Sequence, residues 1–363
     1  MTNSLKEKLS SIALFSVFIN KLFVNIKRVW AQIIAILLAF LTGAIILLAT
    51  GYSPLEAYSS LLVGSFGNLT SIGLTFSKAT PIIFTALAFS FAYKSGLFNI
   101  GAEGQLLIGG FAAALVGISF PNLPSIIHIP LALLAAALLG GLWSFIPALL
   151  KVWLGAHEVI TTMMLSYVAS YFTSYLVTYP FKAPGWVSQT VPISSSAELP
   201  RLLQSSQVSG ALLLSLLLVV ITWYIFQKTS FGYEIRAIGL NSTAAENAGI
   251  NVKRGMVYAL VISGAMAGLG GAGEILGVHR RFIDGFSPGY GWDGLAVALV
   301  GGLHPLGILL AAILFGALRS GGIVMARVVG VPLDIIFLLQ ALVILYVSTP
   351  KLIRYIVKRG KSK

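Results

Sequence analysis

Apolar runs recur along almost the whole chain, and several are as long as a membrane-spanning helix. The first run covers residues 31–50, and about 20 such residues cross the hydrocarbon core of a bilayer. Charged residues make up only 10% of the sequence, whereas about a quarter of a soluble domain is charged. The runs lack the alternation of polar and apolar residues that membrane β-barrels show. The sequence therefore predicts an all-α, polytopic membrane protein.

Apolar length and flanking proline or glycine residues delimit ten candidate membrane segments. Several are shorter than a full crossing, so we expect half-spans among them. The predicted segments are 31–50, 79–93, 105–120, 128–150, 159–179, 209–227, 255–277, 294–302, 305–318 and 332–349. On this basis a transmembrane domain covers residues 31–350, preceded by a basic interfacial segment, 1–30, and followed by a basic tail, 351–363.

The placement of Lys and Arg predicts the orientation in the membrane. Sixteen of the 24 basic residues lie in four regions, which are 1–30, Lys151, 228–254 and 351–363. Basic residues collect in cytoplasmic loops of membrane proteins, so the net charge of +13 does not indicate a nucleic-acid partner. Ten crossings with a cytoplasmic N terminus place all four regions and both termini inside. Arg280 and Arg281 fall outside on this topology, which suggests a local role for them.

The sequence contains no motif for catalysis or nucleotide binding. The C-terminal string RGKSK contains Gly-Lys-Ser, but a phosphate-binding loop requires a further glycine five positions before Gly360, where this chain has Tyr355. The four histidines show no metal-site spacing, and the chain has no cysteine. We therefore predict that this chain is not an enzyme and holds no cofactor of its own.

A short helix is predicted inside the mixed-charge loop 228–254. Asn or Ser at its start can cap the free backbone N–H groups, and glycine at its end can adopt a left-handed conformation. The residues expected to form it are Asn241, Ser242, Ala244, Ala245, Glu246 and Gly249. The helix is either a solvated connector or a docking element for a cytoplasmic partner.

The string GLFNIGAEGQLLIGG, residues 96–110, interrupts the apolar sequence with glycines and polar residues. Irregular backbone at membrane depth is tolerated only where protein buries it or where it lines a cavity. Phe98, Asn99, Glu103 and Gln105 are therefore candidate residues of a solute path. The alternative is close packing of helices at the glycines. Glu103 argues against packing alone, because packing glycines need no carboxylate beside them.

A second interruption, GYGWDGLAVALVGG at residues 289–302, again places an acid before glycine. Its Trp292 and Asp293 join the candidate path residues, since an aromatic ring can pack on a flat face of a solute and a carboxylate can accept from hydroxyl groups. Transporters often bind solute where interrupted segments of two related halves meet. We therefore hypothesise that predicted segments two to five and seven to ten are such halves.

Three strings together resemble one known family. EIRAIGLNSTAAENAGINVKRGMVYALVISGAMAGLGGA, residues 234–272, closely resembles permease subunits of ABC importers for simple sugars and nucleosides, a group related to the ribose and branched-chain amino acid permeases. GLFNIGAEGQ, residues 96–105, and HEVITTMMLSY, residues 157–167, are similar to the nucleoside-type branch. The resemblance covers about residues 31–350. It implies a vitamin-B12-importer-like architecture of ten helices that moves a nucleoside or a related simple sugar inward.

The resemblance also implies partners in a bacterial cytoplasmic membrane. These are a second, related permease, a cytoplasmic ATPase that often carries two fused nucleotide-binding domains and binds the ATP, and an extracytoplasmic solute-binding protein or lipoprotein. Residues 241–250 would be the coupling helix that docks on the ATPase. An ion-coupled secondary transporter is the alternative, for which Glu103, Glu274 and Asp334 could supply ion sites.

Overall fold

The computed structural model describes residues 32–349, and within this range the chain is helical without a β-strand. Seven of the helices are long and apolar enough to cross a membrane. The prediction of an all-α, polytopic membrane protein is therefore confirmed. The predicted basic segments 1–30 and 351–363 lie outside the described residues.

The chain divides into two compact units, which we treat separately. The terminal unit comprises residues 1–55 and 334–363 and contains the helix Gln32–Ala49 and α13 (Asp334–Ser348). In this unit the hydroxyl groups of Thr42 and Tyr346 lie 2.9 Å apart and join the two helices. The main unit comprises residues 56–333 and contains all of the candidate site residues.

Eleven α-helices lie in or extend into the main unit. They are α2 (Pro54–Phe66), α3 (Leu69–Tyr93), α4 (Ala102–Ser119), α5 (Ser125–Leu154), α6 (Glu158–Thr178), α7 (Ala211–Lys228), α8 (Ser230–Leu240), α9 (Ser242–Asn247), α10 (Val252–Glu274), α11 (Tyr290–Val300) and α12 (Pro305–Val329). A π-helical turn, η2 (Ile275–His279), extends α10. Each predicted membrane segment corresponds to a helix, and α11 has 11 residues, too few for a full crossing.

Two predicted boundaries are wrong, and two helices, α2 and α8, were missed. Helix α3 begins at Leu69 and continues through Pro81, which the sequence analysis took as a helix start. A membrane helix tolerates proline where packed neighbouring helices surround it, and Pro81 and the residues on either side of it in α3 are buried. Helix α12 continues to Val329 rather than ending at 318, and α2 was not predicted.

The centre of the main unit is formed by α3, α4 and α10, whose residues are mostly buried. Helix α10 packs against α4 and α5, and α3 packs against α11 and α12. Glycines permit these contacts: a Cβ added at Gly109 would overlap the backbone of Gly268, and one at Gly140 would lie 2.5 Å from the carbonyl of Gly264. Close packing therefore explains Gly109 in the string 96–110.

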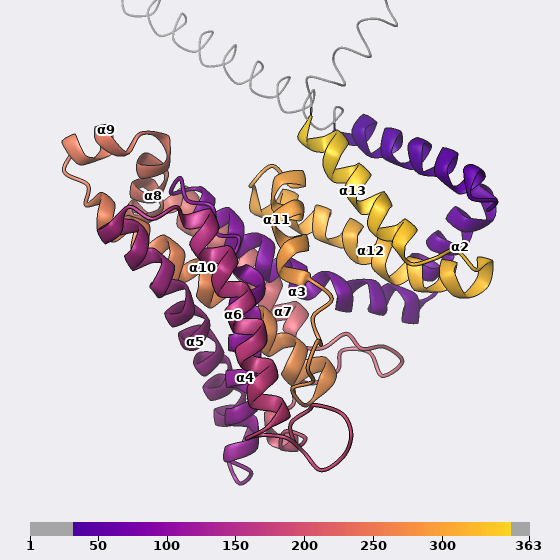
Figure 1. The fold of residues 1–363 in the computed structure, drawn as a ribbon, viewed down its shortest axis with the longest axis horizontal. Helices are drawn as coiled ribbons and strands as arrows, with labels where there is room; N and C mark the ends of the chain where they lie inside the picture. The colour runs from indigo at the N-terminus through magenta and orange to yellow at the C-terminus, as the bar shows by residue number, and fades with distance from the viewer. Residues whose placement is uncertain (1–31, 350–363) are drawn as a thin grey trace, which may run out of the picture. The chain divides into compact units, whose positions relative to one another are not determined.

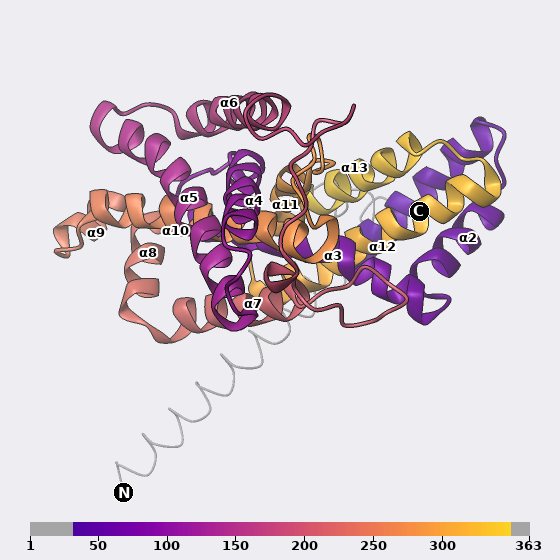
Figure 2. The ribbon, with the colours of Figure 1, turned by 90° about the horizontal axis from the view of Figure 1, so that it is seen from below.

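The two ends of the main unit differ in secondary structure, since one end is helical and the other is largely irregular. Figure 1 shows α8 and α9 at one end and the irregular segment between α6 and α7 at the other. Figure 2 shows α6 and α7 on opposite sides of the central helices. Helix α6 has the most polar composition of the long helices in this unit, with ten Ser, Thr or Tyr residues among its 21 positions, and it is absent from the seven apolar candidates.

Candidate functional site: a hydroxyl- and carboxylate-lined cavity

The interruption before α4 is held by a reciprocal pair of buried amides. Asn99 donates from Nδ2 to Oε1 of Gln105 (2.9 Å) and to Oγ of Ser263 (2.7 Å). In return its Oδ1 accepts from Nε2 of Gln105 (3.1 Å) and from the backbone N–H of Gly101 (3.0 Å). Both amides are 1% exposed. The structure therefore places Asn99 and Gln105 in a closed network that braces the chain break, away from the cavity described below.

Phe98 is half-buried against other aromatic side chains and does not line the cavity described below. Its ring contacts Phe89 and Tyr93 edge-on, with ring centroids 5.3 and 5.2 Å apart. These three aromatic rings fill the space beside the break between α3 and α4.

Glu103 connects the two interruptions that the sequence analysis compared. It lies in the first turn of α4, and its Oε2 accepts a 2.6 Å hydrogen bond from the backbone N–H of Gly291 in the first turn of α11. A Cβ at Gly291 would overlap the backbone of Glu103, so the starts of the two helices are in direct contact. Because the first N–H groups of a helix lack partners within the helix, this carboxylate stabilises α11 from outside.

Asp293 binds an arginine that the sequence analysis did not single out. Both Nε and a terminal nitrogen of Arg319, on α12, lie 2.7 Å from Oδ2 of Asp293. The guanidinium also donates to the carbonyl of Pro288 (3.2 Å) and lies over the ring of Tyr290, 5.2 Å from its centroid. A charge at membrane depth normally pairs with another, so an arginine in the middle of α12, away from the Arg327 in its last turn, was the available signal.

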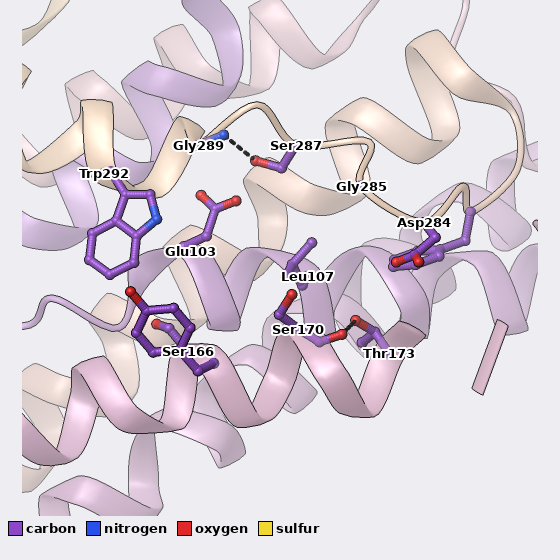
Figure 3. Close-up of a pocket in the computed structure, with 12 residues that line it drawn as sticks. Glu103, Leu107, Ser166, Ser170, Thr173, Asp284, Gly285, Ser287, Gly289 and Trp292 are labelled. Carbon is purple, nitrogen blue, oxygen red and sulfur yellow. Dashed lines mark hydrogen bonds between the residues drawn. The ribbon is translucent and has the colours of Figure 1, made fainter. Parts of the chain in front are cut away.

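A cavity of about 230 Å³ opens between α4, α6 and the segment that leads into α11. Its wall consists of Glu103, Leu107, Ser166, Tyr167, Ser170, Thr173, Phe282, Asp284, Gly285, Ser287, Gly289 and Trp292. Figure 3 shows Trp292 at one end, Asp284 at the other and Glu103 between them. Of the predicted path residues, Glu103 and Trp292 line this cavity, whereas Phe98, Asn99, Gln105 and Asp293 do not.

Several polar groups on the cavity wall can still bind a solute. Among the described residues, the Tyr167 hydroxyl, the Ser170 hydroxyl and the Trp292 indole N–H have no hydrogen-bond partner. Asp284 accepts one hydrogen bond, from the Ser174 hydroxyl to Oδ2 (2.8 Å). The wall therefore offers donors and carboxylate acceptors, which can bind hydroxyl groups but form no catalytic arrangement.

The sequence analysis missed the contributions of α6 and of residues 282–287. The α6 residues were overlooked because single hydroxyls inside an apolar helix are common and often bond to the preceding turn, as Thr173 does with Ala169 (2.8 Å). The usable signal was their number, since ten hydroxyl-bearing residues in 21 positions make a poor lipid-facing helix.

Two irregular segments form the outer wall of this region by pairing like short strands. Backbone N–H groups of Thr190 and Ile193 donate to the carbonyls of Phe282 and Arg280 (both 2.9 Å). The Arg280 side chain lies 3.0 Å from the carboxylate of Glu198. Arg280 thus has a local ion-pair partner, as its exceptional position on the predicted topology suggested.

The short helix predicted at 241–249 is present as α9. Oδ1 of Asn241 accepts from the N–H of Ala244 (3.0 Å), which makes Asn241 the N-cap. Gly249 follows with φ +84°, and its N–H donates to the carbonyl of Glu246 (2.9 Å). Ala245 is buried while Glu246 and the neighbouring residues are exposed. The helix therefore presents most of its surface outward at its end of the main unit (Figure 1).

Sequence comparison identifies the class of protein that carries this fold and cavity. Residues 71–348 match the family described as the permease component of branched-chain amino acid transport systems. The chain belongs to this family and is a multi-pass membrane permease of the ABC importer class. No solved structure matches it.

Three curated relatives span nearly the same length. The guanosine ABC transporter permease protein NupP of Bacillus subtilis is 41% identical over 93% of this chain and 98% of the relative. The nucleoside ABC transporter permease protein NupB of Lactococcus lactis is 37% identical over 93% and 95%. The glucose ABC transporter permease protein TsgB13 of Haloferax volcanii is 34% identical over 87% and 86%.

Proposed function

We propose that this chain imports a nucleoside, or a related simple sugar, as one of two permease subunits of an ATP-driven transporter. The observation that carries the proposal is the cavity, which has Trp292 at one end with Tyr167 beside it, and whose wall otherwise carries carboxylate and hydroxyl groups together with Leu107 and Phe282 (Figure 3). A nucleoside has the same division into a flat base and a hydroxylated sugar. Guanosine and glucose, which the names of two relatives specify, share a ring that carries several hydroxyl groups.

Energy would come from a separate ATPase subunit that docks on α9 and binds the ATP. Exposure of Glu246 and of Leu240, which is 88% exposed just before α9, supports a partner at this surface. We place this end of the main unit, with both termini, on the cytoplasmic side, because Lys228, Lys253 and Arg254 lie beside it.

The second permease would cover the exposed face of α6. Tyr167, Tyr171 and Tyr175 repeat at intervals of four along this face and are 47, 76 and 57% exposed. Three tyrosine hydroxyls in a row are unfavourable against lipid chains, because nothing there can accept their hydrogen bonds. A related permease at this face would also close the open side of the cavity. An extracytoplasmic binding protein would deliver the solute from the opposite end to α9.

Uptake by the complete complex tests the proposal. The chain is co-expressed with its neighbouring transporter subunits, and uptake of radiolabelled guanosine, of other nucleosides and of glucose is measured. We expect uptake of a nucleoside that stops when the ATPase subunit is inactivated by substitution and persists when the proton gradient is collapsed. Uptake that instead depends on the ion gradient, or the absence of uptake for every nucleoside and sugar, contradicts the proposal.

A further inference from the structure

We propose that the cavity is a solute-binding subsite of the permease itself, which takes the sugar ring of an uncharged nucleoside between Glu103 and Asp284 and holds the base against Trp292. The inference rests on the proposed function and adds to it a defined site and a rule of selection.

The polar end offers hydrogen-bond acceptors of the kind that sugar hydroxyls require. Glu103 accepts hydrogen bonds from the Gly291 backbone N–H and the Ser287 side chain, both neutral, and among the ion pairs of the described residues none involves Glu103 or Asp284. Each carboxylate can accept further hydrogen bonds. A hydroxyl that donates to a carboxylate forms a bond roughly twice as strong as one between neutral groups. Ser170 adds a hydroxyl that is free to donate or accept.

The aromatic end offers two half-exposed rings. The centroids of Tyr167 and Trp292 are 6.4 Å apart with their planes inclined by 41°. The rings are 47 and 37% exposed, so a flat base can lie on one of them without displacing a packed side chain. The unpartnered indole N–H of Trp292 and hydroxyl of Tyr167 can also reach polar edge atoms of a base.

The volume indicates which part of the solute is enclosed. Pockets that enclose a complete drug-sized ligand measure about 300–1,000 Å³, whereas this cavity measures about 230 Å³. The space therefore fits a pentose ring, with the base lying at the open rim where Tyr167 and Trp292 are exposed. A site that encloses only part of the solute binds weakly, as release toward the cytoplasm requires.

The charge of the wall selects against phosphorylated solutes. Glu103 and Asp284 are both acidic, and no Lys or Arg side chain lines the cavity. A nucleotide would bring its phosphate close to carboxylates in a partly water-excluded space, where repulsion between like charges is strong. The subsite therefore fits nucleosides and excludes nucleoside monophosphates.

Paired solutes and variants test this inference in the complete complex, reconstituted in liposomes with its own binding protein. Uptake of guanosine is compared with that of 2′-deoxyguanosine and 3′-deoxyguanosine for the wild type, Asp284→Asn and Ser170→Ala. We expect each substitution to lower the efficiency of guanosine uptake, about tenfold for Asp284→Asn, while at least one deoxy analogue changes less than about twofold. For each solute, the uptake efficiency of the variant is divided by that of the wild type. The binding protein's own preference among the solutes therefore cancels.

Glu198→Gln is the matched control, because this carboxylate pairs with Arg280 outside the cavity. It should lower uptake of all three solutes equally or not at all. Parallel losses for guanosine and both deoxy analogues in Asp284→Asn and Ser170→Ala, or no loss in either, overturn the subsite. Ser170→Ala removes a single oxygen, so it remains informative if Asp284→Asn fails to assemble. Absence of guanosine uptake by the wild type contradicts the proposed function instead, which separates the two failures.

Discussion

The backbone N–H of Gly291 donates a 2.6 Å hydrogen bond to Oε2 of Glu103, although the two residues are 188 positions apart in the sequence. This bond joins the start of α4 to the start of α11 and also fixes a carboxylate on the cavity wall. Glu103 therefore both lines the cavity and joins the starts of two helices, and its binding of solute stays our proposal. The two purposes can be separated by substitution.

Glu103→Gln and Glu103→Ala should separate bracing from solute binding. The amide oxygen of Gln can still accept from Gly291, whereas Ala leaves that buried N–H without a partner at a cost of about 1–3 kcal/mol. We expect Glu103→Ala to lower the unfolding temperature of the purified complex clearly and Glu103→Gln to lower it only slightly. Both should reduce uptake. Equal unfolding temperatures for the two variants would show that the bond to Gly291 does not stabilise the fold.

Breaking the ion pair between Asp293 and Arg319 should destabilise the permease strongly. The Arg319 side chain is 10% exposed and that of Asp293 17%, and removing one partner of a buried pair costs about 3–5 kcal/mol because the other charge stays buried. We expect Arg319→Gln to reduce the yield of monodisperse protein in detergent. The double variant Arg319→Gln/Asp293→Asn should recover much of that yield, because it leaves no unpaired charge. A double variant no better than the single one would rule out this explanation.

Helix α9 should couple ATP hydrolysis by the ATPase subunit to solute transport by the permease. Deletion of 241–250, or Glu246→Lys, should abolish solute-stimulated ATP hydrolysis while the permease stays folded, because most of these residues are exposed and they lie at one end of the main unit (Figure 1). Asn241→Ala should act in the same direction more weakly, since loss of a helix N-cap costs about 1 kcal/mol. Asn68→Ala is the matched control, because Asn68 caps α3 by accepting from Ser71 (2.8 Å). Normal stimulation in the deletion variant would refute the coupling assignment.

Local sequence signals predicted the helices well and the site only in part. Each segment predicted from apolar length corresponds to a helix in the structure. The residue types at 241–249 also predicted α9, because helix capping depends on adjacent residues. The extent of α3 was mispredicted, because the sequence does not show that Pro81 lies buried inside a packed helix, where a proline need not end the helix. The contact of Glu103 with Gly291 depends on tertiary packing, which no local pattern encodes.

Some residues of the cavity wall could be predicted from the sequence, and others could not. Glu103 and Trp292 stood out because each is polar or aromatic beside glycine, whereas Ser170 and Asp284 became recognisable only when α6 and the segment before α11 were seen to face one space. Asn99 and Gln105 looked equally polar in the sequence, yet they satisfy each other's hydrogen bonds. A polar residue is therefore available to a solute only if other groups of the protein have not already used its hydrogen-bond donors and acceptors.

The glycine contacts between α4 and α10 should be intolerant of even one added carbon. A Cβ at Gly109 would overlap the Cα of Gly268, and both positions are backbone, so neither can move aside without shifting a helix. We expect Gly109→Ala to lower the unfolding temperature and the yield of assembled permease, and Gly109→Val to prevent assembly. Gly210→Ala is the control, because its φ is −54° and its added Cβ would meet nothing closer than 3.6 Å. If Gly109→Ala is as stable as Gly210→Ala, the helices are not held at backbone contact.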